Sequence, residues 1–222
     1  MKKYIPILLV LSMLLAGCNN SQKIPAETAA TTSAAETAIS AVTIYPLPDS
    51  TMDTLDNATI AISLEEGDAY LDDTGIMRMD VKVYTYDRFD MVDIAGVKAG
   101  DTIVKHDAEV VVTSVERNDF GTVLINGGLE NGGFDLFTDD SGVYFELGFS
   151  DVKNWYEVGE VTLRVSADLE FRDNMDPEQG EQIYYAGSFL VGEVTDYHFI
   201  PHNTTIRTEN GQIVSMERIY TP

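Results

Sequence analysis

The chain has 222 residues, of which 14 are Lys or Arg and 37 are Asp or Glu, so its formal net charge is −23 at pH 7. Such an excess of negative charge repels nucleic-acid phosphates and anionic lipid headgroups, which argues against nucleic acid as a partner. The same charge attracts cations, although acidic side chains on a protein surface also serve solubility alone.

The first seventeen residues have the layout of a secretory signal peptide. Lys2 and Lys3 supply a basic start, and an apolar run extends from Ile5 to Leu15. A membrane-spanning helix needs roughly 20 apolar residues, so this run is too short to remain in the bilayer. The segment therefore predicts export of the protein.

The residues that follow the apolar run read LAGC and end at Cys18. They resemble the lipobox of bacterial lipoproteins. The resemblance implies cleavage between Gly17 and Cys18, acylation of Cys18 by chains such as palmitate, and anchoring at the extracytoplasmic face of a bacterial cell membrane. Cys18 is the only cysteine, so the fold must hold without an internal disulfide. A buried free thiol is the alternative interpretation of this residue.

Residues 18–50 form the predicted lipidated N-terminus and linker. The stretch is rich in Ala, Thr and Ser and has no aromatic residue before Tyr45. It cannot bury enough apolar surface to offset the entropy lost on ordering. We expect a flexible tether that holds the remaining chain away from the membrane.

Residues 51–222 are predicted to form an antiparallel β domain, either a sandwich or two fused small barrels with a boundary near residues 130–150. The clearest strand is Glu160 to Phe171, where apolar and polar residues alternate throughout. Further strands are predicted at residues 58–64, 78–83, 109–115, 122–126, 143–147 and 183–191.

Turn signals support this assignment. Asn210-Gly211 lies between two alternating runs and predicts a β-hairpin. A second tight turn is expected at His106-Asp107. The one candidate helix lies at residues 150–160, where Asp151 could cap a single turn before Gly159 ends it.

Two loops rich in acidic residues are candidate calcium sites. NGGLENGGFDLFTDDSG, residues 126–142, offers Asp135, Asp139 and Asp140 as oxygen ligands, and DNMDPEQGE, residues 173–181, offers Asp173 and Asp176. The spacing matches neither an EF-hand loop nor a nonapeptide calcium repeat. Ordinary turns at the Asn-Gly and Asp-Pro pairs are the alternative.

Four aromatic residues are candidates for contacting a glycan or a protein ligand. They occur as two neighbouring pairs, Trp155-Tyr156 and Tyr184-Tyr185. On a strand, one ring of each pair faces the core and the other faces solvent. The alternative is that the rings only complete the core and cover its edges.

No catalytic motif accompanies these candidates. His198 and His202 are separated by Pro201, which argues against a helix that would align them on a zinc ion. We therefore expect a membrane-anchored extracytoplasmic lipoprotein that acts as a surface binding or interaction module. The alternative is a cell-envelope hydrolase, directed at glycans or peptides, that uses a pair of acidic residues.

Overall fold

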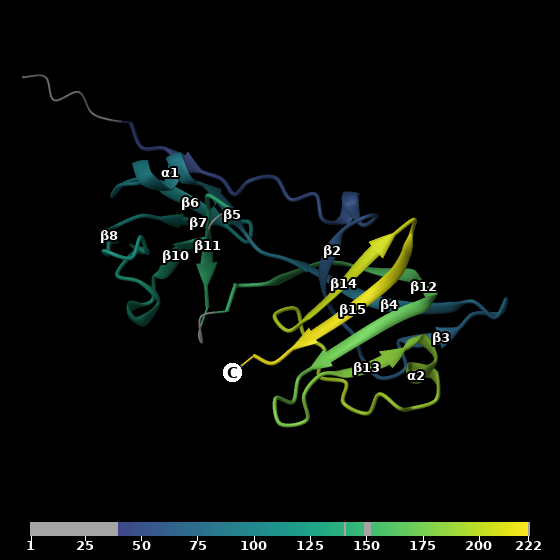
Figure 1. Ribbon diagram of the computed structural model, residues 1–222. Helices are drawn as coiled ribbons and strands as arrows, with labels where there is room; N and C mark the ends of the chain where they lie inside the picture. Colours follow the sequence, from purple (N-terminus) through teal and green to yellow (C-terminus); the bar gives the residue numbers. More distant parts are fainter. Residues whose placement is uncertain (1–39, 140, 149–151, 222) are drawn as a thin grey trace, which may run out of the picture. The chain divides into compact units, whose positions relative to one another are not determined.

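Strands dominate the structure. The computed structural model describes residues 40–139, 141–148 and 152–221 (Figure 1). Of these described residues, 48% are in strands and 10% in helices. This confirms the predicted mainly β fold class. Cys18, the predicted signal peptide and most of the predicted linker lie outside the described residues. Within the described ranges, no helix has the length and apolar character needed to cross a membrane.

The elements are named in chain order. The strands are β1 (Thr43–Ile44), β2 (Thr59–Ser63), β3 (Ala69–Leu71), β4 (Met77–Thr85), β5 (Arg88–Asp90), β6 (Thr102–Lys105), β7 (Ala108–Val111), β8 (Val115–Arg117), β9 (Val123–Ile125), β10 (Phe134–Thr138), β11 (Val143–Leu147), β12 (Tyr156–Asn174), β13 (Gln182–Tyr185), β14 (Thr204–Glu209) and β15 (Gln212–Ile219). The helices are α1 (Met91–Gly96) and α2 (Ala186–Leu190), with single 3-10 turns at Met52–Thr54 and Leu129–Asn131.

Five strands close into a barrel. They hydrogen-bond in the order β12-β15-β14-β2-β4, and β4 pairs with β12 to close the ring. Figure 1 shows β14, from the end of the chain, beside β2 from its beginning. The pairing of β12 with β15 is parallel, and the other pairings in the ring are antiparallel. In sequence order the third and fifth barrel strands are thus parallel neighbours, which is the arrangement of an OB-type Greek-key barrel.

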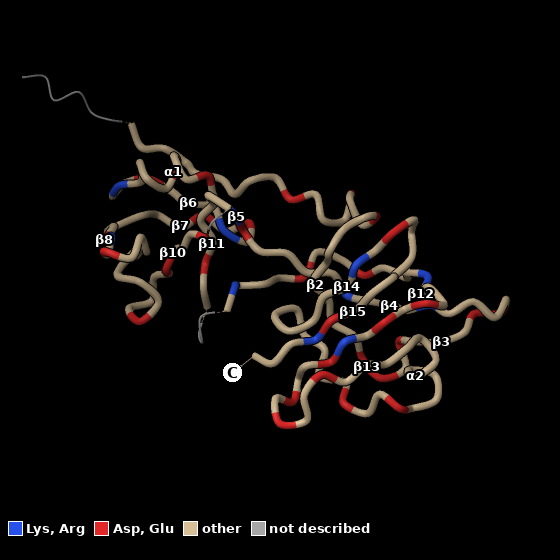
Figure 2. The backbone as a smooth tube through the Cα atoms, viewed as in Figure 1, with Lys and Arg blue, Asp and Glu red and all other residues tan. Residues whose placement is uncertain are grey.

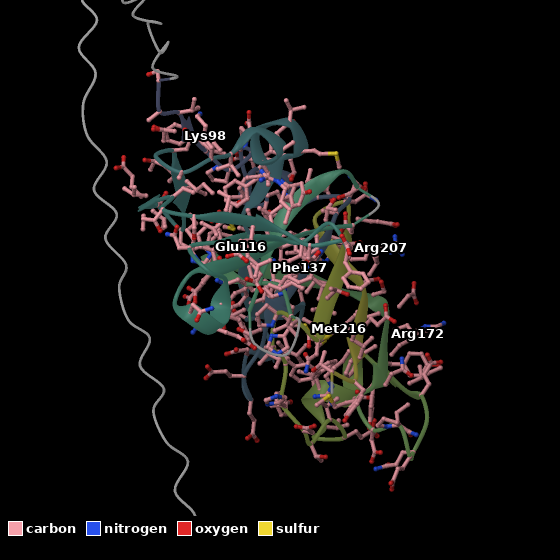
Figure 3. All side chains as sticks on the ribbon, turned by 90° about the vertical axis from the view of Figure 1, so that its left-hand side faces the viewer. Lys98, Glu116, Phe137, Arg172, Arg207 and Met216 are labelled. Atoms are coloured by element: carbon pink, nitrogen blue, oxygen red, sulfur yellow. The ribbon has the colours of Figure 1, made fainter. Side chains whose placement is uncertain are left out.

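The barrel interior is filled by the inward-facing half of each alternating strand. Met79 and Val83 on β4 have no exposed surface, and Met216 on β15 is 1% exposed. In Figure 3, Arg172 on β12 and Arg207 on β14 point away from the ribbon, and their side chains are 52% and 49% exposed. The period of two along a strand explains both placements.

The chain between β4 and β12 builds a second apolar core together with β1. One sheet has the order β5-β11-β10-β9-β8, and a smaller one has the order β1-β6-β7 with β1 and β6 parallel. Buried side chains of these sheets and of α1, among them Phe89, Ile94, Ile103, Ile125 and Leu136, form a cluster distinct from that of the barrel. The barrel is therefore interrupted by a long insertion between its second and third strands.

Most predicted strands are confirmed, and three assignments are wrong in part. The strand predicted at 183–191 ends at Tyr185, because residues 186–190 form α2, where the Ser188 hydroxyl accepts a hydrogen bond from the Tyr185 amide at 3.3 Å. The strand predicted at 109–115 is interrupted after Val111, since the Thr113 amide donates its hydrogen bond to the Asn126 side chain instead of to a neighbouring strand. The described part of the candidate helix at 150–160 instead leads into β12 at Tyr156.

Candidate functional site: the Asp87 pocket

The glycine-rich stretch at 126–142 contains a run of turns whose side-chain oxygens accept hydrogen bonds from backbone amides of the protein. Asn126 and Gly127 adopt left-handed φ angles of 55° and 84°. The Asn126 Oδ1 atom accepts from the Thr113 amide at 2.7 Å, and Asp135 Oδ1 accepts from the Leu129 amide at 3.0 Å. The glycines serve chain geometry, because a Cβ on Gly133 would lie 1.9 Å from the Ile125 carbonyl oxygen.

The other candidate calcium ligands also accept hydrogen bonds within the protein. Asp139 accepts from the Ser141 amide at 2.8 Å, and the Ser141 hydroxyl bonded to it is the main cause that lowers the pKa of Asp139. Asp176 accepts from the Gln179 side chain at 2.6 Å, and Asp140 lies outside the described residues. Asp173 pairs with the buried Arg218, whose Nη2 atom donates to Asp173 Oδ2 at 2.5 Å. Among the described residues, no three His, Cys, Asp or Glu side chains are grouped to hold a metal ion.

The four candidate aromatic residues lie at opposite ends of β12 and do not form one platform. Tyr184 stacks on Phe171 with ring centres 5.6 Å apart, and Tyr185 is 60% exposed beside the far end of the strand. Trp155 and Tyr156 lie at its beginning. Tyr184 lines a pocket of about 220 Å³ whose buried polar groups, Asp173 and Arg218, are paired with each other. The second pair adjoins a larger pocket that combines rings with a buried carboxylate.

That pocket has a volume of about 340 Å³, which is the size of a site for a small ligand or a single side chain. We call it the Asp87 pocket. It is lined by residues 46–49, 86–88 and 106–107 and by Tyr156. Its wall thus combines the approach to the barrel, the connection from β4 to β5, the β6–β7 turn and the first residue of β12.

Asp87 is the central polar group of the pocket. Its side chain is 4% exposed. The Tyr156 hydroxyl donates to Asp87 Oδ1 at 2.9 Å, and the His106 amide donates to Oδ2 at 2.8 Å. Burial, followed by the hydrogen bond to Asp87, raises the pKa of Tyr156 far above its ordinary value. Tyr156 therefore remains a protonated donor at any physiological pH.

The β6–β7 turn presents two side chains to the pocket from an unfavourable backbone conformation. His106 and Asp107 both have left-handed φ angles, 45° and 60°, as a two-residue turn of this kind requires. The predicted hairpin at Asn210-Gly211 uses the favoured residues for the same purpose, with φ angles of 52° and 71°. A left-handed φ angle costs a non-glycine residue about 1 kcal/mol of conformational free energy. The cost is smaller for Asp and His, which adopt this conformation more often than most residues. Residues held in such conformations cluster at functional sites.

An aromatic cluster borders the pocket. The Trp155 and Tyr86 rings meet edge to face with centres 4.8 Å apart, and the His106 ring meets Tyr156 in the same way at 4.6 Å. The Lys153 ammonium donates to the Tyr86 hydroxyl at 2.9 Å and lies 4.7 Å from the centre of the Phe145 ring. These contacts fix the rings before any ligand arrives.

A second cavity, of about 280 Å³, lies on the face of the barrel formed by β4 and β12. OB-type barrels commonly bind their ligands on this face. Here four carboxylates line it, from Glu65, Asp68, Asp80 and Glu160, against the single ammonium of Lys82. Figure 2 shows that Asp and Glu also outnumber Lys and Arg elsewhere on the described chain. This face offers no aromatic wall and carries the wrong charge for nucleic acid.

Tyr156 and the turn at His106-Asp107 are both recognisable in the sequence, but their proximity is not. Asp87 is not recognisable there, because 37 acidic residues leave no way to choose one before the fold is known. One feature of the sequence does indicate the site. The hairpin predicted around His106-Asp107 lacks the Asn-Gly pair that such turns favour.

Comparisons of this chain with protein-family models, with curated proteins and with solved structures find no match.

Proposed function

We propose that the protein is a membrane-anchored extracytoplasmic lipoprotein that binds a ligand in the Asp87 pocket. The lipobox-like sequence ending at Cys18 and the Ala/Thr/Ser-rich stretch after it support the anchor and the tether. The pocket supports the binding role. OB-type topology alone does not, because one fold hosts many functions.

One observation carries the choice of site. The turn at residues 106–107 consists of His106 and Asp107, whereas the turn at residues 210–211 of the same chain has the favoured Asn-Gly pair. The His106 and Asp107 side chains line the pocket, and the His106 amide donates a hydrogen bond to Asp87. A hairpin with no role beyond connecting strands gains nothing from this choice of residues.

Anchoring is tested by replacing Cys18 with serine. Expression with a clickable palmitate analogue should label the unaltered chain and not Cys18→Ser, and the variant should leave the membrane fraction. A labelled Cys18→Ser protein would contradict the assignment of the acylated residue.

Binding is tested through Trp155, the only tryptophan of the chain. Its ring contacts Tyr86, which lines the pocket, so occupancy should change its fluorescence. We would screen residues 18–222 against amines, amino acids, glycans and short peptides, and repeat each hit with His106→Asn/Asp107→Gly. Hits that survive this replacement unchanged would place the ligand elsewhere.

The hydrolase alternative is tested in the same screen. Both oxygens of Asp87 already accept hydrogen bonds from the protein, which suits an anchoring group. Turnover of a glycan or peptide that is abolished by replacing Asp49 or Asp87 with asparagine would replace the binding proposal with a catalytic one.

A further inference from the structure

We propose that the Asp87 pocket binds an organic ammonium group carried on an apolar stem, such as the side chain of lysine or a simple alkylamine. The inference rests on the proposed function, which makes this pocket the ligand site, and it adds the chemical class of the ligand.

The charges around the pocket favour a cation. Asp49, Asp87 and Asp107 line it together with one guanidinium, that of Arg88, so the lining carries three negative charges against one positive. His106 also lines the pocket, with its Nε2 atom 3.8 Å from Asp87 Oδ2. With a neutral imidazole the count keeps a negative excess even when Lys153, which contacts Tyr86, is included. After burial and the hydrogen bond to Asp87, the charges of Asp87, Asp49 and Asp107 further raise the pKa of Tyr156.

The walls of the pocket fit an apolar stem. Residues 46–48 are Pro, Leu and Pro, and together with the rings of Tyr86 and Tyr156 they supply surface without hydrogen-bonding side chains apart from the hydroxyls. Lysine-like stems bury their methylenes on such surfaces while the charged head reaches polar groups. Aromatic rings beside carboxylates are also the usual recognition elements for ammonium ligands.

The same aromatic cluster already holds an ammonium group from the protein. The Lys153 Nζ atom lies 4.3 Å from the centre of the Tyr86 ring and 4.7 Å from that of Phe145. Its hydrogen bond to the Tyr86 hydroxyl, at 2.9 Å, shows that the ammonium lies toward the oxygen end of that ring. The rings beside the pocket thus accommodate an ammonium group within the protein's own structure.

The decisive comparison is between pentylamine and pentan-1-ol, which share the stem and differ in charge. We expect pentylamine to change Trp155 fluorescence saturably and to raise the unfolding midpoint of residues 18–222, with much less effect from the alcohol. Added salt should weaken the binding, since part of the attraction is between partly exposed charges. Equal effects of amine and alcohol would overturn the inference.

Charge-changing variants provide a second test. Asp107→Asn keeps the size of the side chain and should weaken pentylamine binding about three- to tenfold, whereas Glu109→Gln on the same hairpin, an exposed acid outside the lining, should leave it unchanged. Arg88→Gln should strengthen binding by removing the repelling charge. Weaker binding by Arg88→Gln, or no effect of Asp107→Asn, would contradict the inference.

Two further probes separate the outcomes. A tripeptide with a central lysine that binds more tightly than pentylamine identifies a protein or peptide as the source of the ammonium group, and the reverse order identifies a free amine. If a neutral glycan binds and no amine does, the ligand class is wrong while the Asp87 pocket remains the site. If no probe in the screen binds, the proposed function fails as well.

Discussion

Replacing Asp173 with asparagine should remove the hydrogen-bonded counter-charge of the buried Arg218 guanidinium and leave it only the exposed Asp196 carboxylate, 3.6 Å from Nη1. The Arg218 side chain is 2% exposed, and that of Asp173 is 11% exposed. Arg218 donates from Nε to Asp173 Oδ1 at 2.9 Å and from Nη2 to Oδ2 at 2.5 Å. Its Nη1 atom donates to the Asp196 carbonyl at 2.8 Å, and its guanidinium lies 4.5 Å from the centre of the Phe199 ring.

The expected loss is about 3 kcal/mol in the free energy of unfolding. Breaking one partner of a buried ion pair costs about 3–5 kcal/mol because the other charge stays buried. The small exposure of Asp173 places this pair at the lower end. For a chain of this size, each kcal/mol corresponds to roughly 2–4 °C in the unfolding midpoint, so Asp173→Asn should unfold about 6–12 °C earlier.

Urea unfolding provides the assay, with a shifted midpoint at unchanged slope as the expected result. Glu160→Gln is the matched control on the same strand, since Glu160 and Lys82 are 3.9 Å apart with side chains 69% and 40% exposed. An exposed pair of this kind contributes about 0–1 kcal/mol. If Asp173→Asn lost no more than Glu160→Gln, the guanidinium would have another route to stabilisation and the reasoning would be refuted. The double variant Asp173→Asn/Arg218→Met should recover much of the free energy of unfolding that Asp173→Asn loses, because it no longer contains the buried charge.

Three further predictions concern two glycines, the half-buried His202 and the acidic loops. Gly133→Ala should lower the free energy of unfolding by about 3 kcal/mol or more, because the added Cβ would lie 1.9 Å from a backbone oxygen. Gly187→Ala, in α2 with open space around it, should raise the free energy of unfolding by up to about 1 kcal/mol. Urea unfolding measures both, and equal effects would contradict the close approach at Gly133. Burial, then the charge of His198, lowers the pKa of His202 below its ordinary value of 6.5. The unfolded state therefore takes up the proton first, so stability should fall as the pH drops from 7.5 to 5.5, and less so in His202→Gln; identical pH profiles would count against this origin. Millimolar calcium should leave the unfolding midpoint unchanged, because the described acidic candidates accept hydrogen bonds from the protein, and a clear rise would restore the calcium hypothesis.

The strands of the barrel were predictable because their pattern is local. Residues 160–171 alternate between apolar and polar side chains, and β12 contains all of them. Asn210-Gly211 likewise specifies its turn through its own backbone preferences. Helices α1 and α2 have six and five residues, too few to show a 3.6-residue period. They depend on capping contacts, such as that from the Val92 amide to the Asp90 side chain at 2.7 Å.

The candidate site was only half predictable. Tyr156 and His106 were visible as residue types, but they are 50 positions apart and meet only because β12 returns beside the end of β4. The candidate calcium ligands were recognisable as residue types, but the partner predicted for them was a metal ion and the partner of Asp173 in the structure is Arg218. Asp173 appears in the sequence as one of several acids in a polar loop, and only the register of β12 on β15 places it opposite Arg218.

The sequence by itself determined the acidic charge and the alternating strands, and it carries the prediction of a signal peptide, since each depends on neighbouring residues or on composition. It did not determine the closure of the barrel, the insertion between β4 and β12 or the Asp87 pocket. These depend on pairings between distant segments, which the alternation permits in many registers. The tertiary structure selects one register by burying both apolar clusters at once, and that selection brings Asp87, His106 and Tyr156 together.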